Sequence, residues 1–327
     1  MLAVEATGEG IAAITVSELP DPPAPGPREV ALEMLAMCIN PADLLTLEGR
    51  YGVKPEPPFI PGAEGVARIT AVGAEVQGLA PGDVVIPFGG SCWRERMTVK
   101  ASAVVKLPAG VDLDQAAMLK ANPATALGML SDIVPLSPGD WVAQNAANSA
   151  VGVNVIKVAK KLGLRTVNIV RREAAAARLR DMGADLVLVH DGEGPAPAIP
   201  EDARPKLAFD AIGGPATDAL AGIMAEGGTI ANYGLLSGKS CQVDPYHLVF
   251  RAVTLKGYWL ATWFQTAGAD VLAERYAQLV DWMADGTVGA PVLARYPLAR
   301  AAEAVAHAAR EARDGKILLT TAAHPEG

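Results

Sequence analysis

The stretch GDWVAQNAANSAVGVNVIKVAKKLG, residues 139–163, decides the fold of this chain. A short apolar run, Trp141–Gln144, follows a Gly-Asp turn and predicts a buried strand. Five small or polar residues, Asn145–Ser149, come next, and an apolar series at helical spacing then runs from Val151 to a closing glycine. A strand, a tight turn and a helix form the first half of a dinucleotide-binding βαβ unit, which brings backbone N–H groups at a helix N-terminus close to a pyrophosphate.

The turn departs from the usual glycine-rich signature of such units. Gly152 is its one glycine, and Ala147 and Ala150 stand where glycines often occur. Alanine permits a close approach of a ligand but does not adopt a positive φ at low cost. Taken alone, the turn therefore also fits an ordinary βα connection of an α/β core, and the assignment depends on the rest of the chain.

Bulk properties exclude several classes of protein. The 327 residues are enough for two domains with sizeable cores. No apolar run approaches the roughly 20 residues that span a bilayer, and a net charge of -8 argues against a nucleic-acid partner. The N-terminus lacks the order of a signal peptide, and the three cysteines, Cys38, Cys92 and Cys241, imply neither a disulfide framework nor a metal motif. We expect a soluble protein of the reducing cytoplasm with no membrane partner.

The first part of the chain, to about residue 106, alternates short apolar segments with Pro/Gly turns and predicts a small barrel-like β domain. The strands expected there are Arg28–Met37, Glu64–Val72, Val84–Ile86 and Arg94–Val99. A short helix is expected over Asn40–Gly49, because Pro41 suits the first helical position. A helical connector should begin in Asp112–Met118.

From Trp141 the pattern changes to alternating strands and helices, which is typical of a doubly wound parallel sheet. The six strands expected are Trp141–Gln144, Thr166–Val170, Leu186–Val189, Leu207–Phe209, Gly228–Tyr233 and Val253–Trp259. The helices expected between and after them include Ala174–Met182, Ala216–Met224 and Ala301–Ala312. A closing strand, Lys316–Thr320, should return to the β domain. The fold class is thus α/β, with residues 1–120 in a catalytic domain, 121–262 in a cofactor domain and 263–327 returning to the catalytic domain.

The end of the second predicted strand of the sheet indicates which nicotinamide cofactor binds. In such folds an Asp or Glu there binds the ribose 2′-OH of NAD, whereas basic residues accommodate a 2′-phosphate. Here Val170 is followed by Arg171 and Arg172, and a guanidinium offers bidentate donors to a phosphate. The pair also fits two solvated surface arginines, and Glu173 comes next. We expect NADPH as the cofactor.

With these pieces in place, the sequence resembles the medium-chain dehydrogenase/reductase superfamily over nearly its whole length. Within that superfamily it is similar to the zinc-less 2-enoyl thioester reductases of the mitochondrial type. The stretches that carry the resemblance are Ile39–Asp43, Glu48–Gly52, Pro61–Ala67, Ala121–Ala126, Gly139–Val142, Gln144–Ser149, Leu164–Asn168 and Leu255–Leu260. The resemblance implies a GroES-like, mostly β catalytic domain and a Rossmann cofactor domain with a doubly wound parallel sheet.

The resemblance also implies roles for single residues. Tyr51 stands where the family has its catalytic tyrosine, Asn122 where a residue holds the cofactor near the nicotinamide, and Lys316 where a basic residue reaches the cofactor. The other implied cofactor contacts are Asn148, Ser149, Ala150 and Val151 at the pyrophosphate, Arg171 and Arg172 at the 2′-phosphate, and Tyr233, Gly234, Leu235, Leu236, Tyr258, Trp259 and Leu260 along the nicotinamide and substrate cleft. Two positions depart from the family: Ala150 replaces a usual glycine and Glu173 a frequent arginine.

Zinc alcohol dehydrogenases of the same superfamily place a Cys just before the helix that starts here at Pro41, and a His in a Gly-His-Glu phrase. This sequence has Asn40 and Ala63 at those positions and lacks the four-cysteine structural lobe. Cys38 lies two residues early, and the four histidines are scattered through later segments. Because zinc needs three or four converging N, S or O ligands, we expect no metal site and interpret Cys38 as a buried core thiol.

Without a metal to polarise a carbonyl, the expected reaction is conjugate reduction of an enoyl thioester linked to CoA or acyl carrier protein. The thioester makes C3 of a 2,3-double bond electrophilic, so C3 accepts hydride from NADPH and C2 is then protonated. A phenol is protonated at pH 7 and can donate, which suits Tyr51 in its Pro/Gly-rich loop. From the residues alone, simple packing of Tyr51 fits as well.

Other functions remain open at this stage. The chain also fits a zinc-less NADPH:quinone oxidoreductase, a reductase of other activated alkenes, or a cofactor-binding protein without turnover. An aromatic group after the last predicted strand, Trp259, Trp263 and Phe264, fits either an acyl pocket or a core or subunit contact. The strand Val253–Trp259 should form the edge of the sheet, which in the superfamily pairs across a two-fold axis. Since a bare apolar edge invites aggregation, we expect a homodimer.

Overall fold

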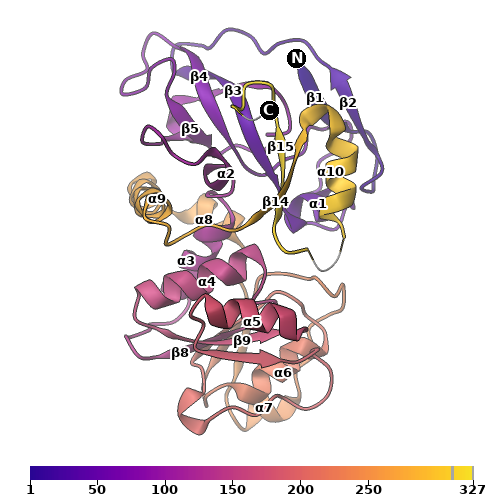
Figure 1. The fold of residues 1–327 in the computed structure, drawn as a ribbon, viewed down its shortest axis with the longest axis vertical. Coiled ribbons are helices and arrows are strands. Elements are labelled where there is room, and N and C mark those ends of the chain that lie inside the picture. Colours follow the sequence, from indigo (N-terminus) through magenta and orange to yellow (C-terminus); the bar gives the residue numbers. More distant parts are fainter. Residues whose placement is uncertain (311–312, 326–327) are drawn as a thin grey trace. The chain divides into compact units, whose positions relative to one another are not determined.

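The computed structural model describes residues 1–310 and 313–325. The chain divides into two compact units (Figure 1), one made of Met1–Ala121 with Ala273–Gly327 and the other of Asn122–Leu272. The first unit is built mostly of strands and the second alternates strands and helices. The mixed α/β class, with a GroES-like β domain and a Rossmann-like domain, is therefore confirmed.

The first unit contains a seven-stranded sheet in the order β14-β15-β3-β4-β5-β7, and β6 also pairs with β3. A separate pair, β1 and β2, precedes it. Its elements are β1 (Leu2–Ala6), β2 (Ile14–Glu18), β3 (Glu29–Ile39), α1 (Pro41–Leu47), β4 (Gly65–Val72), β5 (Val84–Pro87), β6 (Arg96–Lys100), β7 (Val104–Lys106), α2 (Leu113–Ala116), β14 (Val292–Pro297), α10 (Ala301–Ala308) and β15 (Lys316–Thr320). The four strands predicted before residue 106 are all present, with ends shifted by at most two residues.

The core of this unit forms where α10 covers the sheet. Ala301, Ala304, Val305 and Ala308 recur at helical spacing and are all buried against apolar side chains of the strands. Small side chains let the helix approach closely, and Figure 1 shows it beside β14 and β15. The predicted helix extended to Ala312; α10 ends at Ala308, and residues 311 and 312 lie outside the described part of the chain.

The C-terminal strand returns to the first unit as predicted. β15 pairs in antiparallel register with β3, with Ile317 opposite Ile39, and in parallel register with β14. This pairing places Lys316, the first residue of β15, next to the carboxyl end of β3 and the start of α1. Two residues 276 positions apart in sequence, Lys316 and Asn40, are thereby in hydrogen-bond contact.

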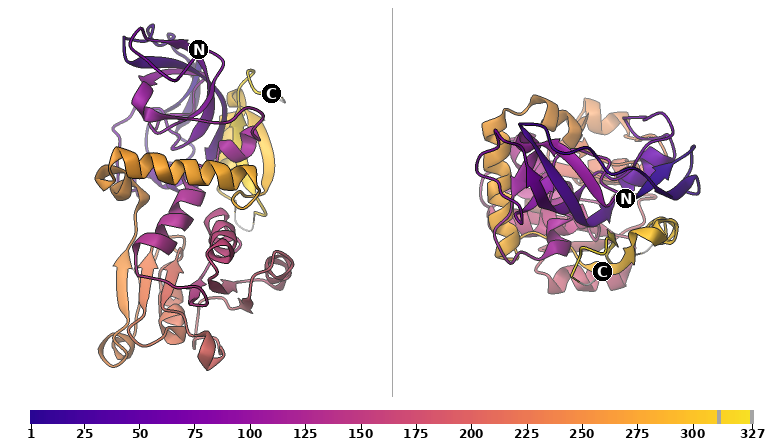
Figure 2. Two further views of the ribbon diagram at one scale, coloured as in Figure 1. Left: turned by 90° about the vertical axis from the view of Figure 1, so that its left-hand side faces the viewer. Right: turned by 90° about the horizontal axis from the view of Figure 1, so that it is seen from above.

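The second unit is a six-stranded, all-parallel sheet in the order β10-β9-β8-β11-β12-β13. Its elements are α3 (Asn122–Asp132), β8 (Trp141–Gln144), α4 (Ala150–Lys161), β9 (Arg165–Val170), α5 (Glu173–Asp181), β10 (Leu186–Val189), β11 (Leu207–Asp210), α6 (Pro215–Ile223), β12 (Thr229–Asn232), α7 (Pro245–Val249), β13 (Thr254–Gly257) and α8 (Leu260–Thr266). A long helix, α9 (Ala269–Ala284), spans the boundary between the two units and is seen from the side in Figure 2. The six predicted strands are all confirmed, in the order of a doubly wound fold.

Alternation along the strands sends apolar side chains to both faces of this sheet. Val167 and Ile169 pack in one cluster with α6, whereas Val170 packs in another with α4 and α5. In Figure 1, α4 and α5 lie on one side of β8 and β9, and α6 lies on the other. Two layers of helices thus bury a parallel sheet on both faces.

The sixth strand differs from its prediction at both ends. Pairing with β12 covers only Thr254–Gly257, and Trp259 is the residue before α8 rather than part of the strand. β13 lies at the edge of the sheet, as expected. In the described part of the chain, no helix is both long and apolar enough to cross a membrane.

Candidate active site

The predicted pyrophosphate turn is a tight connection between β8 and α4. Ala146 takes the one positive φ in it, +47°, which alanine adopts at some cost. Ser149 caps the helix, and its Oγ accepts a hydrogen bond from the Gly152 amide at 3.1 Å. A Cβ on Gly152 would lie 2.5 Å from the carbonyl oxygen of Ala147. Gly152 is therefore required for close packing, and the first turn of α4 directs its backbone N–H groups out of the sheet edge, a geometry that suits an anion.

The predicted 2′-phosphate site follows β9. Arg171 and Arg172 are both exposed, and Arg172 is the residue before α5. The Glu173 carboxylate accepts a hydrogen bond from the Arg180 guanidinium within the same helix. Glu173 is thus paired with a cation of its own helix. Arg171 and Arg172 precede it in the sequence and are exposed. This arrangement fits a phosphate better than a neutral ribose hydroxyl.

The segment after β12 lies against the pyrophosphate turn. Burial raises the pKa of Tyr233, and the Tyr233 hydroxyl is hydrogen-bonded to the Ser149 side chain. Gly234 lies so close to the neighbouring loop that a Cβ would be 2.6 Å from the carbonyl oxygen of Ala211. Leu235 and Leu236 are exposed. The structure therefore brings together two of the predicted cofactor segments, residues 148–151 and 233–236.

The remaining predicted residues of this unit lie near the same edge of the sheet or on α3. The Tyr258 amide donates to the Asn232 carbonyl at 2.9 Å, so residues 258–260 leave the sheet beside the end of β12. Asn122 begins α3 and is 7% exposed. Helices α3 and α8 pack together within this unit. Ligands of such folds bind at the carboxyl ends of the strands, and the predicted cofactor residues of this unit, Asn122 apart, come from these ends.

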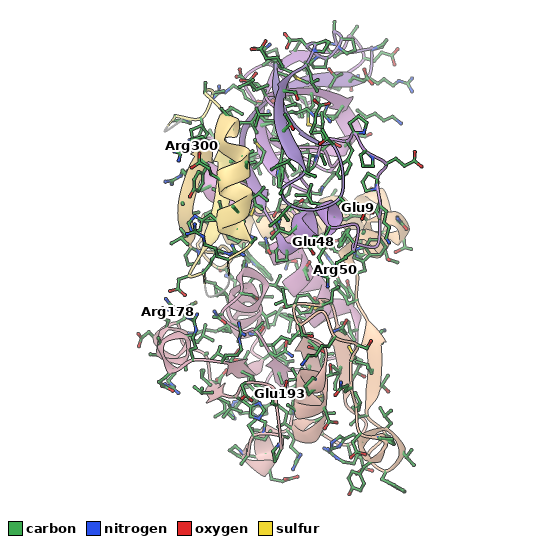
Figure 3. All side chains as sticks on the ribbon, turned by 90° about the vertical axis from the view of Figure 1, so that its right-hand side faces the viewer. Glu9, Glu48, Arg50, Arg178, Glu193 and Arg300 are labelled. Carbon is green, nitrogen blue, oxygen red and sulfur yellow. The ribbon has the colours of Figure 1, made fainter. Side chains whose placement is uncertain are left out.

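Tyr51 lies in the first unit, on the loop that leaves α1. The backbone amides of Arg50 and Tyr51 both donate to the Leu45 carbonyl, at 2.8 and 3.1 Å. Gly49 has a φ of +65°, and a Cβ there would lie 3.0 Å from a carboxylate oxygen of Glu9. Figure 3 shows Glu9, Glu48 and Arg50 gathered around this turn. The half-buried Tyr51 side chain is therefore presented on a turn whose backbone is fixed by the end of α1.

Beneath α1 the first unit contains a buried polar cluster, formed by Asn40, Asp43, Glu64, Lys120 and Lys316, each no more than 8% exposed. Asn40 is its centre: its amide nitrogen donates to Glu64 at 2.6 Å, and its oxygen accepts from the Lys316 ammonium at 2.5 Å. Glu64 also accepts from the Ala121 amide at 2.8 Å. The Lys120 ammonium donates to the Ala63 carbonyl at 2.6 Å and to the Gly89 carbonyl at 3.2 Å.

Asp43 ties α1 to this cluster. One carboxylate oxygen accepts from the backbone amide of Asn40 and the other from the backbone amide of Ala63, both at 2.8 Å. Sequence reasoning identified Asn40 as a position where zinc enzymes carry a cysteine, but it did not find Asp43, Glu64 or Lys120. The available signal was Glu64 itself, a lone carboxylate in the otherwise apolar stretch Pro61–Ala67.

Burial dominates the electrostatics of the cluster. It raises the pKa of Asp43 from 3.8 to about 6, raises the pKa of Glu64, and lowers the pKa of Lys120. Two carboxylates and two ammonium groups share the site, so each buried charge has an opposite charge nearby. Such an arrangement compensates desolvation without adding much net stability.

Where zinc dehydrogenases carry ligands, this chain has Asn40, whose oxygen accepts from the Lys316 ammonium, and Ala63. Among the residues that the structure describes, no three His, Cys, Asp or Glu side chains are grouped to hold a metal ion. Cys38 is fully buried, as predicted, and burial raises the pKa of its thiol. Metal independence, and contact between Lys316 and a cofactor, stay predictions.

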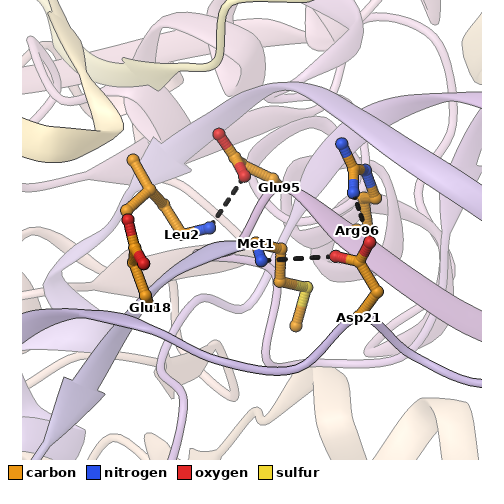
Figure 4. A pocket seen from close by; sticks show the side chains of 6 residues that line it. All are labelled: Met1, Leu2, Glu18, Asp21, Glu95 and Arg96. Carbon is orange, nitrogen blue, oxygen red and sulfur yellow. Dashed lines mark hydrogen bonds and ion pairs between the residues drawn. The ribbon is translucent and has the colours of Figure 1, made fainter.

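A surface pocket of the first unit lies around the N-terminus and is not part of the predicted site (Figure 4). Met1, Leu2, Glu18, Asp21, Glu95 and Arg96 line it. The N-terminal ammonium donates to the Leu19 carbonyl at 2.8 Å and pairs with Asp21 at 3.2 Å, and Glu95 accepts from the Leu2 amide at 2.7 Å. These contacts fix the start of β1.

Comparisons with known proteins agree with this geometry. The profile of the alcohol dehydrogenase GroES-like domain matches residues 26–109, and that of the zinc-binding dehydrogenase family matches residues 150–285. The chain is 38% identical over 280 residues to the mitochondrial enoyl-[acyl-carrier-protein] reductase of Homo sapiens, covering 83% of this chain and 75% of that protein.

Two solved structures have the same fold. A putative NADPH:quinone reductase of Bacillus thuringiensis matches with a TM-score of 0.85 at 26% identity, covering 98% of both chains. Etr1p, a mitochondrial 2-enoyl thioester reductase of Candida tropicalis solved with NADP and crotonyl-CoA, matches with a TM-score of 0.85 at 24% identity, covering 98% of this chain and 99% of that one.

The two domains and the arrangement at the sheet edge define an oxidoreductase of the medium-chain dehydrogenase/reductase superfamily, and the chain belongs to that superfamily. Within it, the sequence is similar to the mitochondrial enoyl thioester reductases.

The buried cluster predicts a pH dependence of stability. Because the folded-state pKa of Asp43 is raised, the folded protein binds more protons than the unfolded chain between pH 3.8 and about 6. The contribution of Asp43 to the free energy of unfolding is therefore fully present below pH 3.8 and is lost as pH rises through about 6, by about 3 kcal/mol in total. Replacing Asp43 by Asn should remove this decrease, which chemical denaturation between pH 4.5 and 7.5 measures.

Asp83→Asn serves as the control. The hydrogen bond from Lys106 lowers the pKa of Asp83, so its contribution is present above pH 3.8 and is lost as pH falls through the lowered pKa. The contribution of Asp83 is therefore constant between pH 4.5 and 7.5, and removing it should leave the pH slope in that range unchanged. An Asp43→Asn protein with the same pH slope as the wild type would show that Asp43 does not retain its proton in the folded state.

Proposed function

We propose that this chain is an NADPH-dependent oxidoreductase that reduces the 2,3-double bond of an enoyl thioester carried by CoA or acyl carrier protein. The observation that carries the proposal is Tyr51, a tyrosine whose backbone is held by the end of α1, in a chain 38% identical to an enoyl-[acyl-carrier-protein] reductase. The exposed Arg171 and Arg172, with Glu173 paired to Arg180, support NADPH over NADH.

The residues present fit this chemistry. When bound, NADPH supplies a hydride, which C3 of the double bond accepts with its electron pair. The negative charge then develops on C2 and the thioester oxygen. Tyr51 donates its phenolic proton to C2 or holds the thioester oxygen by a hydrogen bond, and water returns the proton to the phenolate. Asn148–Val151 at the N-terminus of α4 bind the pyrophosphate, and Asn122 and Tyr233–Leu236 bind the nicotinamide half.

Tyr51→Phe tests the acid. The substitution removes one hydroxyl and keeps the ring, so packing is preserved while the proton donor is lost. With crotonyl-CoA, kcat should fall by about 10²-fold or more at saturating NADPH, because positioned proton transfer contributes that much. The loss of NADPH absorbance measures turnover, and fluorescence titration shows that NADPH still binds. Unchanged turnover would show that Tyr51 is not the proton donor and that its side chain only packs.

A second candidate function is NADPH:quinone reduction, which the structural match to a putative quinone reductase at 26% identity favours. A quinone takes up the hydride without a protein acid at Tyr51. The same assay with a simple quinone separates the two functions: turnover of quinone alone, with equal rates for wild type and Tyr51→Phe, would replace the thioester proposal.

The arginine pair predicts cofactor preference. Replacing Arg171 and Arg172 together by alanine should raise KM for NADPH by about 10- to 100-fold, since charge-assisted hydrogen bonds to a phosphate are lost. KM for NADH, which has no 2′-phosphate, should change little. Lys206→Ala is the control, because Lys206 pairs with Asp140 before the opposite end of β8. An equal change for both cofactors would place the 2′-phosphate elsewhere.

We also propose that two copies pair along β13 to form a homodimer. All four residues of β13 are exposed, and the segment that precedes it presents Val249, the last residue of α7, at 68% and Phe250 at 72% exposure. An edge strand with open backbone groups and apolar neighbours is covered by self-association in stable proteins.

Phe250→Asp tests the dimer, because a charge at the interface opposes association. Sedimentation velocity should show a dimer for the wild type and an increased monomer fraction for the variant. Leu293→Asp, a similar change at an exposed residue of β14, should leave the dimer intact. A monomeric wild type would contradict the proposal. The reducing cytoplasm remains our proposed location, in keeping with three free cysteines.

A further inference from the structure

Asp210 is a buried carboxylate that the predicted site does not include. It is the last residue of β11, at the centre of the carboxyl edge of the sheet, and it is 0% exposed. In the described part of the chain, its contacts are all uncharged donors. A buried anion held in this way depends on every one of its hydrogen bonds.

The carboxylate joins the two loops that carry predicted cofactor residues. Oδ1 accepts from the Asn145 side chain at 2.7 Å and from the backbone amides of Ile212 and Gly213 at 2.9 and 3.0 Å. Oδ2 accepts from the Thr217 hydroxyl at 2.6 Å, from the Asn232 side chain at 3.2 Å and from the Cys241 thiol at 3.9 Å. Asn145 starts the pyrophosphate turn after β8, and Asn232 ends β12, directly before Tyr233.

Both asparagines transmit this anchoring to the loops. The Asn145 oxygen accepts from the Ala211 amide at 2.8 Å, and the Asn232 nitrogen donates to the Gly234 carbonyl at 3.0 Å. Each side-chain amide is thus oriented by a hydrogen bond to Asp210 and makes a second hydrogen bond to a backbone group of a loop. Only an acceptor-only group satisfies all six donors; an amide in its place would present an N–H₂ to at least one of them.

A second contact joins the same two loops, between the Tyr233 hydroxyl and the Ser149 side chain. With the Asp210 hydrogen bonds and this contact, the spacing between residues 148–151 and 233–236 is fixed at two places. The exposed Arg171 and Arg172 stand after β9, a different strand, and take no part in either contact.

We infer that Asp210 is a positioning residue for the cofactor. It sets the spacing between the pyrophosphate turn and the Tyr233–Leu236 segment, and it thereby governs binding of the pyrophosphate and nicotinamide half of NADPH. The 2′-phosphoadenosine half binds independently of it. The inference rests on the proposed function, since it presumes that NADPH is the ligand.

Asp210→Asn tests the inference with two ligands. Titration of the full chain with NADPH, followed by nicotinamide fluorescence, should give a Kd raised about tenfold or more. Isothermal titration with adenosine 2′-monophosphate, which lacks both the pyrophosphate and the nicotinamide half, should give a Kd within about twofold of the wild type. A general loss of structure would weaken both ligands together, so this selectivity distinguishes positioning from stability.

Asp185→Asn is the matched control. Its carboxylate accepts from the Thr166 amide and hydroxyl, at 2.9 and 3.2 Å, near the amino end of β9 in the same sheet. The Asp185→Asn substitution should lower the melting temperature and leave both Kd values unchanged. Asn232→Ala, a milder change in the Asp210 network, should reproduce the selective loss and serves if Asp210→Asn does not fold.

The outcomes separate the two proposals. A wild type that fails to bind NADPH would overturn the proposed function. A wild type that binds NADPH, together with variants that bind it as tightly or that lose both ligands equally, would overturn the role of Asp210 alone.

Discussion

The second unit depends on one close approach, between the first turn of α4 and the connection that follows β8. Gly152 lies against Ala147 with no room for a Cβ. This contact lets a parallel strand turn directly into a helix, so that the amides at the helix N-terminus end beside the carboxyl edge of the sheet. Everything that the candidate site uses in this unit is arranged relative to that edge: the serine cap, the exposed arginines after β9 and the loop after β12.

The same contact explains which parts of the sequence pattern were informative. A glycine at position 152 was essential because it meets backbone, whereas alanines at 147 and 150 are tolerated, since the one positive φ of the turn falls on Ala146. The doubly wound parallel sheet followed from the alternation of strands and helices, because right-handed crossovers leave few alternatives. The ends of the strands did not follow from the pattern. Trp259 continues the apolar run of β13, yet the pairing of β13 with β12 stops at Gly257 and α8 begins at Leu260. Local pattern does not report where pairing stops.

The buried polar cluster was beyond sequence reasoning for a different reason. Asn40, Glu64 and Lys316 come from three distant segments, and only the pairing of β15 with β3 brings the lysine to the asparagine. Their joint burial is a tertiary fact. Once formed, the cluster has a consequence for Tyr51: Asp43 binds α1 to the backbone at Ala63, and the last turn of α1 holds the backbone of Tyr51. Charges that add little net stability still fix the position of a helix, because breaking one contact leaves a buried charge unpaired.

The two units thus stabilise buried carboxylates in opposite ways. In the first, Asp43 and Glu64 lie with Lys120 and Lys316, and burial still raises the pKa of both acids. In the second, the contacts of Asp210 in the described part of the chain are neutral dipoles from three adjacent loops. Dipoles fixed in a framework hold an anion only while their geometry is kept, so a group satisfied in this way couples the loops that supply them. An ammonium on a flexible stem would pair with Asp210 as well, but it would leave those loops free to move apart. The use of amides and a hydroxyl, rather than a cation, is therefore what makes the carboxyl edge of this sheet a rigid template for an extended ligand.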